Sequence, residues 1–356
     1  MSSDQADTTE TMEETEPNTT QGDAEAVDKE DSAPETSKSK APRRRAGWRV
    51  VAAKELSDHL LSGRFVVLMA VLGIATAASV FAASGGIREV APNAEGITAL
   101  FLKLFTVTAE PVPFPLIVFM GFLAPLLGIM FGFDAVNGER SQGTLPRLLA
   151  QPLHRDEVIL GKFVAGLAVI TIMLTCLILF VSGIGIFRLG VVPTPSEISR
   201  LLIWLLFAII YVAFWQALAT LASVTARRAA TSAFIPVGVW LVLTLFGSFI
   251  FGAIATLFSS GGGSPAEQLA SARTEQIVSQ ISPITLFQTG STVLLDPEVR
   301  STGLLTLEQV DRAIVTELDV TQSLLVVWPQ MVTLLAMTAL LFALAYVFFV
   351  RQEVRA

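Results

Sequence analysis

A charged stretch between two long apolar runs carries the residues best suited to binding another protein. It occupies residues 133–162 and reads FDAVNGERSQGTLPRLLAQPLHRDEVILGK. Gly143 permits a sharp turn, Thr144 can cap a helix N-terminus, and Pro152 ends the helix that follows. These signals predict a helix of barely two turns within the stretch.

The short helix would present one apolar face. Leu145, Leu148 and Leu149 fall at positions i, i+3 and i+4, which lie side by side on a helix. So short a helix is marginal alone in water. It needs a groove to hold it, and this favours helix-in-groove docking against a partner protein. In the alternative interpretation, the leucines pack on the chain's own surface.

A second helix is expected directly after the short one. Asp156 and Glu157 open it, where carboxylates suit the positive end of the helix dipole. It continues through Lys162 into an apolar run. A force applied to the short helix would therefore reach a membrane-spanning helix directly.

The residue types that support catalysis or cofactor binding are missing from the sequence. No Gly-x-x-x-x-Gly-Lys-Ser/Thr loop occurs, and Gly161-Lys162 is followed by Phe163, so the chain is not expected to bind ATP. The two histidines, His59 and His154, are far apart in sequence, and Cys176 is the single cysteine. We therefore expect no catalytic residue, cofactor or metal site in this chain.

Composition indicates an all-α polytopic membrane protein. Hydrophobic residues make up 52% of the chain and charged residues only 15%, against about 25% charged in soluble domains. Six apolar runs are each long enough to cross about 30 Å of hydrocarbon. The expected spans are residues 65–83, 115–133, 163–187, 201–224, 233–258 and 325–350.

Lysine and arginine in the loops predict the orientation of these spans. Fourteen of them lie on the side that contains both termini and the stretch 133–162, and seven lie on the other side. The positive-inside rule therefore places both termini, and the short helix between spans 2 and 3, in the cytoplasm.

The segments outside the spans differ strongly in charge. Residues 1–40 hold twelve acidic residues and three lysines, so we expect 1–46 to be a disordered acidic tail with a basic end. Residues 47–64 predict an amphipathic helix on the cytoplasmic leaflet. Residues 259–324 predict an acidic extracytoplasmic segment between spans 5 and 6, and 351–356 form the cytoplasmic C-terminus.

Three motifs resemble a known family. The run from Gly132 to Lys162 is similar to the signature cytoplasmic loop of ABC type-2 transporter permeases, especially their NosY-like branch. KEL at Lys54–Leu56 and SPITLFQTGSTVLLDP at Ser282–Pro297 match as well. The resemblance covers about residues 47–355 and leaves out the acidic tail.

The resemblance implies a non-catalytic subunit that works with partners. Such permeases dimerise, and each copy binds a separate cytoplasmic ATP-binding subunit, which holds the ATP and magnesium. The short helix would be the coupling helix, and the helix over Gly47–Ser62 the connecting helix beside the ATPase. The residues expected to contact that subunit are Glu139, Gly143, Thr144, Leu145, Leu148, Leu149, Pro152 and Arg155.

Two further groups of residues have two interpretations each. Arg227 and Arg228 would make a smaller contact with the ATPase, or serve only as a topology signal. Tyr211, Trp215 and Gln216 are the most polar residues within the fourth span, and they either line a translocation path or pack between helices.

The leading hypothesis is an ABC permease in the plasma membrane, exporting by the family's usual direction, with no nucleic-acid partner. An ion-coupled transporter or channel is the alternative, but it usually places ionisable residues within the membrane, and the six spans contain none. An intramembrane enzyme is disfavoured by the missing catalytic residues, and a scaffold stays open. The motifs do not specify the cargo.

Overall fold

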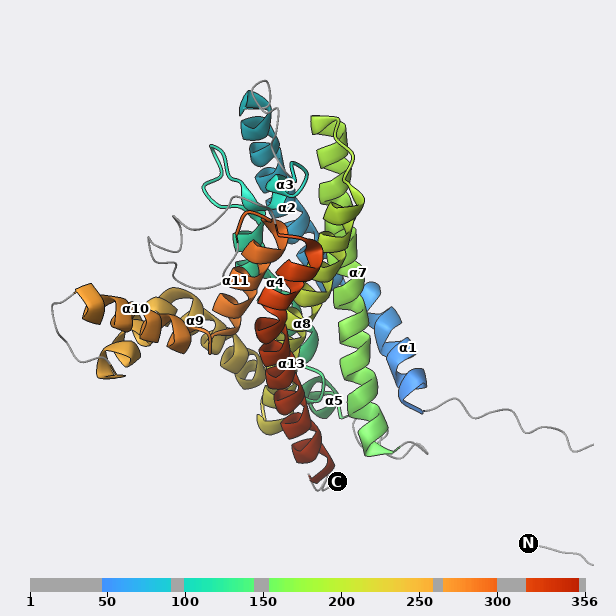
Figure 1. Ribbon diagram of the computed structural model, residues 1–356. Coiled ribbons are helices and arrows are strands. Elements are labelled where there is room, and N and C mark those ends of the chain that lie inside the picture. The colour runs from blue at the N-terminus through green and yellow to red at the C-terminus, as the bar shows by residue number, and fades with distance from the viewer. Residues whose placement is uncertain (1–46, 91–98, 144–153, 259–264, 300–317, 352–356) are drawn as a thin grey trace, which may run out of the picture. The chain divides into compact units, whose positions relative to one another are not determined.

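The computed structural model describes residues 47–90, 99–143, 154–258, 265–299 and 318–351. Within these ranges every named element is a helix and no strand occurs (Figure 1). The all-α class expected from the sequence is therefore confirmed over the described residues. The expected acidic tail and the last five residues of the chain lie outside them.

Five helices are long and apolar enough to cross a membrane, and they match five of the six expected spans. All five continue past the predicted boundaries, because helices can extend beyond the hydrocarbon. They are α2 (Gly63–Val90), α7 (Arg155–Leu189), α8 (Pro195–Thr225), α9 (Ala229–Phe258) and α13 (Val320–Arg351).

The expected second span is present as a shorter helix. This helix, α4, covers Leu116–Gly132 and has 17 residues. At 1.5 Å per residue it is about 26 Å long, slightly less than the hydrocarbon thickness of about 30 Å. The sixth crossing therefore stays a prediction.

Five shorter helices complete the described residues. They are α1 (Gly47–Leu60), α3 (Lys103–Thr106), α5 (Asn137–Ser141), α10 (Pro265–Ser279) and α11 (Pro283–Leu295). The helix expected over 47–64 is thus found as α1, and α2 follows it after two residues.

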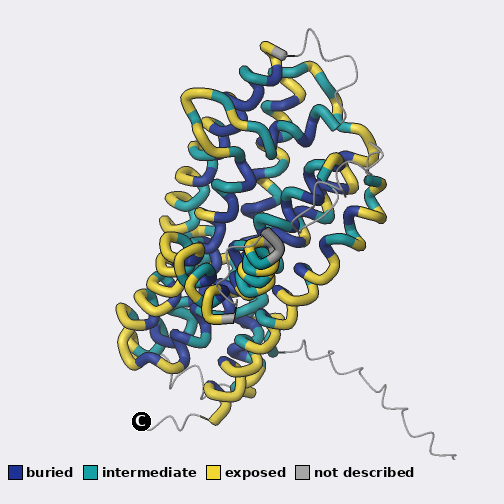
Figure 2. The backbone as a smooth tube through the Cα atoms, turned by 60° about the vertical axis from the view of Figure 1, so that its left-hand side comes forward, coloured by how far each residue is buried: buried dark blue, intermediate teal, exposed yellow. Residues whose placement is uncertain are grey.

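Helix α8 is the centre of the bundle. It contacts α4, α7, α9, α11 and α13, and buried residues concentrate where these helices meet (Figure 2). Trp204, Tyr211 and Trp215 are fully buried on α8. Helix α4 approaches it at two glycines: a Cβ atom on Gly128 would lie 2.4 Å from a carbonyl oxygen of α8, and one on Gly132 would lie 2.6 Å from another.

Helix α11 falls within residues 259–324, which the sequence predicts to lie outside the membrane. It packs against α4, α8 and α13, and the side of the membrane on which it lies stays a prediction. Phe287 stacks on Tyr211 with ring centroids 4.3 Å apart. With 13 residues, α11 is about 20 Å long, which is too short to cross about 30 Å of hydrocarbon.

One end of α8 is held by buried charges. Thr194 caps the helix, and Glu197 accepts hydrogen bonds from the Thr194 backbone N–H at 2.7 Å and the Phe101 N–H at 3.0 Å. Arg200 donates to Ser323 Oγ at 2.9 Å. These bonds tie α8 to the segment before α3 and to the start of α13, and they satisfy two charges that burial would otherwise disfavour.

The other end of the bundle is held by an apolar cluster. Val158 near the start of α7, Val224 near the end of α8, and Ala345 and Phe349 near the end of α13 pack with Val136 just before α5. The cluster brings α5, the first turns of α7 and the end of α13 to the same end of the bundle. This agrees with the predicted alternation of the chain, whereas the side of the membrane stays a prediction.

The close approach of α4 and α8 is testable with Gly128→Ala. The added methyl group has no room beside the α8 backbone, so we expect a loss of about 1–3 kcal/mol of stability, seen as a lower apparent Tm in detergent. Gly73→Ala in α2 is the matched control, because its Cβ would meet nothing within 4 Å. Equal melting of the two variants would contradict the packing described here.

Candidate functional site

The candidate site lies around the stretch that the sequence singles out. The structure describes its first part through Gly143 and its last part from His154 onward. Gly143 has a φ angle of +67°, so the turn expected there is confirmed and needs glycine. The predicted coupling helix, with Thr144, Leu145, Leu148, Leu149 and Pro152, falls on residues outside the described ranges.

The part before the gap is fixed to α8 and α9. Ser223 Oγ accepts hydrogen bonds from the backbone N–H groups of Val136 at 3.0 Å and Asn137 at 3.1 Å. Arg140 donates to the Ala226 carbonyl at 3.4 Å, and Ser232 Oγ donates to a carbonyl of the α4–α5 turn at 2.7 Å. Helix α5, which carries Glu139, therefore has a defined position on the bundle.

The part after the gap is fixed to α1. Glu157 accepts a hydrogen bond from the His154 N–H at 3.2 Å and another from the Gly47 N–H at 2.9 Å. One turn on, a Cβ atom on Gly161 would lie 2.8 Å from both the Trp48 carbonyl oxygen and the Cβ of Val51. Gly161 therefore allows α1 to lie directly on the first turns of α7.

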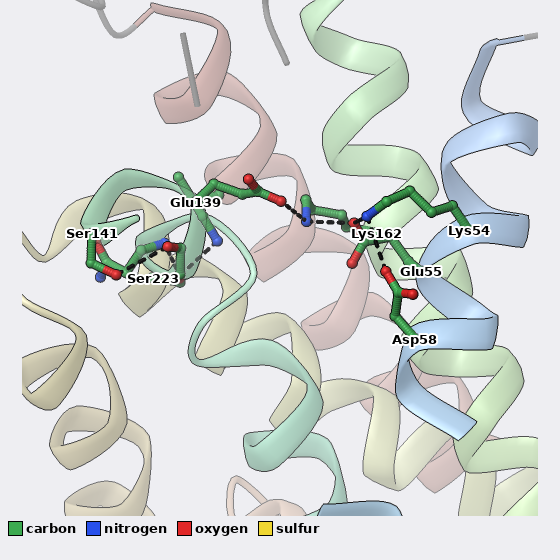
Figure 3. Close-up of polar contacts among 10 residues, drawn as sticks. Lys54, Glu55, Asp58, Glu139, Ser141, Lys162 and Ser223 are labelled. Atoms are coloured by element: carbon green, nitrogen blue, oxygen red, sulfur yellow. Dashed lines mark hydrogen bonds and ion pairs between the residues drawn. The ribbon is translucent and has the colours of Figure 1, made fainter. Parts of the chain in front are cut away.

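Lys162 joins the two parts (Figure 3). Its ammonium group lies 2.8 Å from Glu55 on α1 and 3.3 Å from Glu139 on α5. Only 9% of the Lys162 side chain is exposed. We call Glu55, Glu139 and Lys162 the clamp, because they connect three helices across both ends of the 144–153 segment.

Burial makes the clamp electrostatically demanding. Two carboxylates share one ammonium group, and Lys54 approaches Glu55 to 3.7 Å from a much more exposed position. Hydrogen bonding to Asp58 raises the pKa of Lys54. Removing Lys162 would take away the partner that the two carboxylates share. This would destabilise the fold, because a buried charge without its partner costs free energy.

A second set of contacts surrounds the corner between α1 and α2. The His59 ring meets the Phe131 ring edge-on with centroids 5.1 Å apart, and Arg64 forms an ion pair with Asp134. Burial lowers the pKa of His59, against the carboxylates of Glu55 and Asp134, which raise it. His59 is therefore neutral near pH 7, which suits its contact with an aromatic ring.

Three other predicted contact residues are described. Arg155 is the first residue of α7 and is half-buried. Arg227 and Arg228 are exposed in the turn between α8 and α9, which follows the Ala226 carbonyl that Arg140 contacts. They therefore lie beside α5, but the structure does not bring them into the clamp.

Tyr211, Trp215 and Gln216 are all buried within the bundle. Tyr211 donates a hydrogen bond to the Gly121 carbonyl at 2.7 Å, and Gln216 donates one to the Phe163 carbonyl at 2.9 Å. Trp215 Nε1 and Gln216 Oε1 have no hydrogen-bond partner among the residues that the structure describes. The described contacts fit the helix-packing interpretation, and the role in a translocation path stays a prediction.

Comparison with known proteins decides the family. A family model described as "ABC-2 family transporter protein" matches residues 49–354. The chain belongs to the ABC-2 transporter family. This confirms the resemblance found in the sequence, and with the long apolar helices it makes the chain a multi-pass membrane protein.

Two curated relatives carry the name "Probable ABC transporter permease protein NosY". The one from Stutzerimonas stutzeri is 33% identical over 117 residues, which are 32% of this chain and 36% of the relative. The one from Pseudomonas aeruginosa is 27% identical over 228 residues, which are 60% of this chain and 73% of the relative. The first match thus spans about a third of that relative's length.

Sequence reasoning missed the role of Lys162 and the partnership of Glu55 with it. Both residues stand in motifs that resemble the family, but those motifs do not predict that the two residues pair with each other. A usable signal was present: Lys162 is immediately followed by an uninterrupted apolar run, where a lysine needs an acidic partner or a route to water.

The clamp predicts a large effect of Lys162→Met. The variant removes the buried ammonium group that the partly buried Glu55 and Glu139 share, so we expect a loss of about 1–3 kcal/mol, measured as a lower apparent Tm in detergent. Lys54→Met is the matched control and should cost at most about 1 kcal/mol, because that ion pair is exposed. Adding Glu55→Gln to Lys162→Met should recover part of the loss, and no recovery would argue against charge as the cause.

His59 predicts a pH dependence of stability. Well above pH 6.5 the imidazole is neutral in the folded and unfolded chains, so it contributes no pH dependence there. As the pH falls below 6.5 the unfolded chain is protonated first, so stability drops until the folded state is protonated as well. His59→Phe should therefore lose less apparent Tm than the parent between pH 7 and 5.

Proposed function

We propose that this chain is the membrane-spanning permease subunit of an ATP-driven ABC transporter. A separate cytoplasmic subunit would bind and hydrolyse ATP with magnesium, and this chain would move cargo across the plasma membrane. Export is the expected direction, and both termini would lie in the cytoplasm. Family membership and the relatives' names support the permease assignment.

The clamp is the structural observation that carries the coupling role. It holds Glu139, just before the 144–153 segment, against Lys162, just after it. It also holds α1 against the same lysine. A displacement of the segment would therefore act on α1 and α7 together, rather than being absorbed by a slack loop.

In the proposed mechanism two copies of the chain face each other, each with one ATP-binding subunit. ATP binding draws the two ATPase subunits together. The segment over Thr144–Pro152 moves with them, and α7 passes the motion into the bundle. Arg155, Arg227 and Arg228 would contribute polar contacts at the rim of the same interface.

The distribution of charge favours this function over an ion-coupled transporter or channel. In the five long helices, the charged residues lie within about two turns of a helix end, and α9 has none. Lys162, Glu197 and Arg200 are buried, but each bonds to a neighbouring helix or loop segment at those ends. An ion-coupled protein would instead need ionisable residues along its path.

The decisive experiment is co-purification from native membranes in mild detergent. We expect a soluble subunit with a P-loop to co-purify with this chain at a ratio of about one to one. Replacing Leu148→Asp and Leu149→Asp together should reduce its recovery by at least about tenfold, because two buried apolar contacts are each worth about 1.5–3 kcal/mol. Membrane insertion should be unchanged.

Deletion of residues 1–40 is the control for this experiment, because that acidic tail is not expected to touch the ATPase. The truncated chain should recover the P-loop subunit as well as the parent does. Full recovery by the double aspartate variant would contradict the coupling assignment. Absence of any ATPase from the parent preparation would contradict the permease function itself.

A further inference from the structure

An open groove of about 630 Å³ lies between α9, α10 and α11. Its volume falls within the range of about 300–1,000 Å³ that is usual for small-ligand sites. Among the described residues, none from the clamp or from the predicted coupling contact lines it. The proposed contact with an ATP-binding subunit therefore does not explain the groove.

The groove has an apolar and a polar part, and the polar part is rich in oxygen atoms. Thr244 and Ser248 contribute hydroxyl groups from α9, Ser279 from α10 and Thr285 from α11. Among the described residues that line it, Glu275 alone is charged. The lining therefore offers one carboxylate and several hydroxyl groups on a single concave surface.

The orientation of two of these hydroxyls makes them acceptors. Thr244 Oγ1 donates its hydrogen to the Trp240 carbonyl at 2.7 Å, and Ser279 Oγ donates its own to the Gln276 carbonyl at 2.8 Å. Their oxygen lone pairs remain for a ligand. Together with the Glu275 carboxylate, they favour a ligand that is positively charged or rich in hydrogen-bond donors.

The walls of the groove are held by close contacts. A Cβ atom on Gly252 of α9 would lie 3.6 Å from the Glu275 carboxylate, so α10 lies directly on α9 there. On the α11 side, a Cβ on Gly121 of α4 would lie 3.1 Å from the Gln288 amide. The groove is thus built from packed helices rather than from loops.

The groove contains polar groups from the middle of α9, a helix that is otherwise apolar. Ser248 lies well inside a helix long and apolar enough to span the membrane. Its neighbours Leu245 and Phe249 are large, exposed apolar residues of the kind that face lipid. Hydroxyl groups at such a level can be satisfied by water, by other protein groups or by a carbonyl of their own helix. A carboxylate has no such partner in its own helix, so an open groove that contains Glu275 favours water inside it.

We propose that the α9–α10–α11 groove is a water-filled binding site for a small hydrophilic cation, with Glu275 as its counter-charge. That this cation is cargo rests on the permease function proposed above. That the groove holds water and prefers cations rests only on its own lining. The two statements can therefore fail separately.

Thiol labelling tests the water content of the groove. In a Cys176→Ser background, Ser248→Cys is compared with Leu245→Cys and Phe249→Cys, reconstituted in lipid nanodiscs that leave both membrane faces accessible. The probe is a cationic methanethiosulfonate, which reacts with thiolates. We expect Ser248→Cys to react about tenfold faster than the two controls, since a thiol in apolar surroundings stays protonated and inert.

Charge preference is tested by comparing this cationic reagent with an anionic sulfonate reagent on Ser248→Cys. The ratio of the two rates should fall by about tenfold when Glu275→Gln is added, since a charged cleft concentrates counter-ions. Glu267→Gln on the same helix, outside the groove lining, should leave the ratio unchanged. All variants should first show the parent's elution profile in size-exclusion chromatography.

Each result decides a separate part of the proposal. Equal rates at residues 245, 248 and 249, or no reaction at Ser248→Cys, would overturn the water-filled groove. If Glu275→Gln leaves the ratio of the cationic to the anionic labelling rate unchanged, the preference for cations would be overturned. The labelling needs no ATP-binding subunit, so it can succeed even if the co-purification fails. In that case the cation site would be supported and the transporter function would not.

Discussion

The buried ammonium group of Lys162 is the interaction on which this end of the structure depends. It lies 2.8 Å from Glu55 and 3.3 Å from Glu139. Without it, the two carboxylates would lose the buried charge that they share, and the attraction between α1, α5 and α7 would be weaker. The position of α1 on α7 is set by this charge and by the absence of a side chain at Gly161.

The clamp and the apolar cluster beside it have complementary roles. Val136, Val158 and Phe349 supply non-directional burial that brings α5, α7 and α13 together. The ion pairs and the Ser223 hydrogen bonds then fix α5 in one orientation, since they are directional. Such an arrangement resists small displacements of α5, as a mechanical link must.

Sequence could predict the parts of this fold that follow from local composition. Uninterrupted apolar runs such as those in α7 and α8 predict helices, and the turn at Gly143 follows from the conformational freedom of glycine. Sequence could not predict α11 inside the bundle, because a 13-residue helix is too short for the length argument. Sequence could not predict the clamp either, because Glu55 and Lys162 are 107 residues apart and only the tertiary fold brings them together.

Helix α4 connects the two ends of the molecule where function is proposed. At one end Phe131 meets His59, close to the clamp. At the other end Gly121 contacts Gln288, which lines the groove. Between them, Gly128 and Gly132 lie so close to the α8 backbone that α4 has little room to move toward that helix. Packed interiors are stiff, so a displacement of α4 at the clamp is better transmitted along its length than absorbed. Through α4 the fold offers a direct physical route from the expected ATPase contact to the proposed cation site.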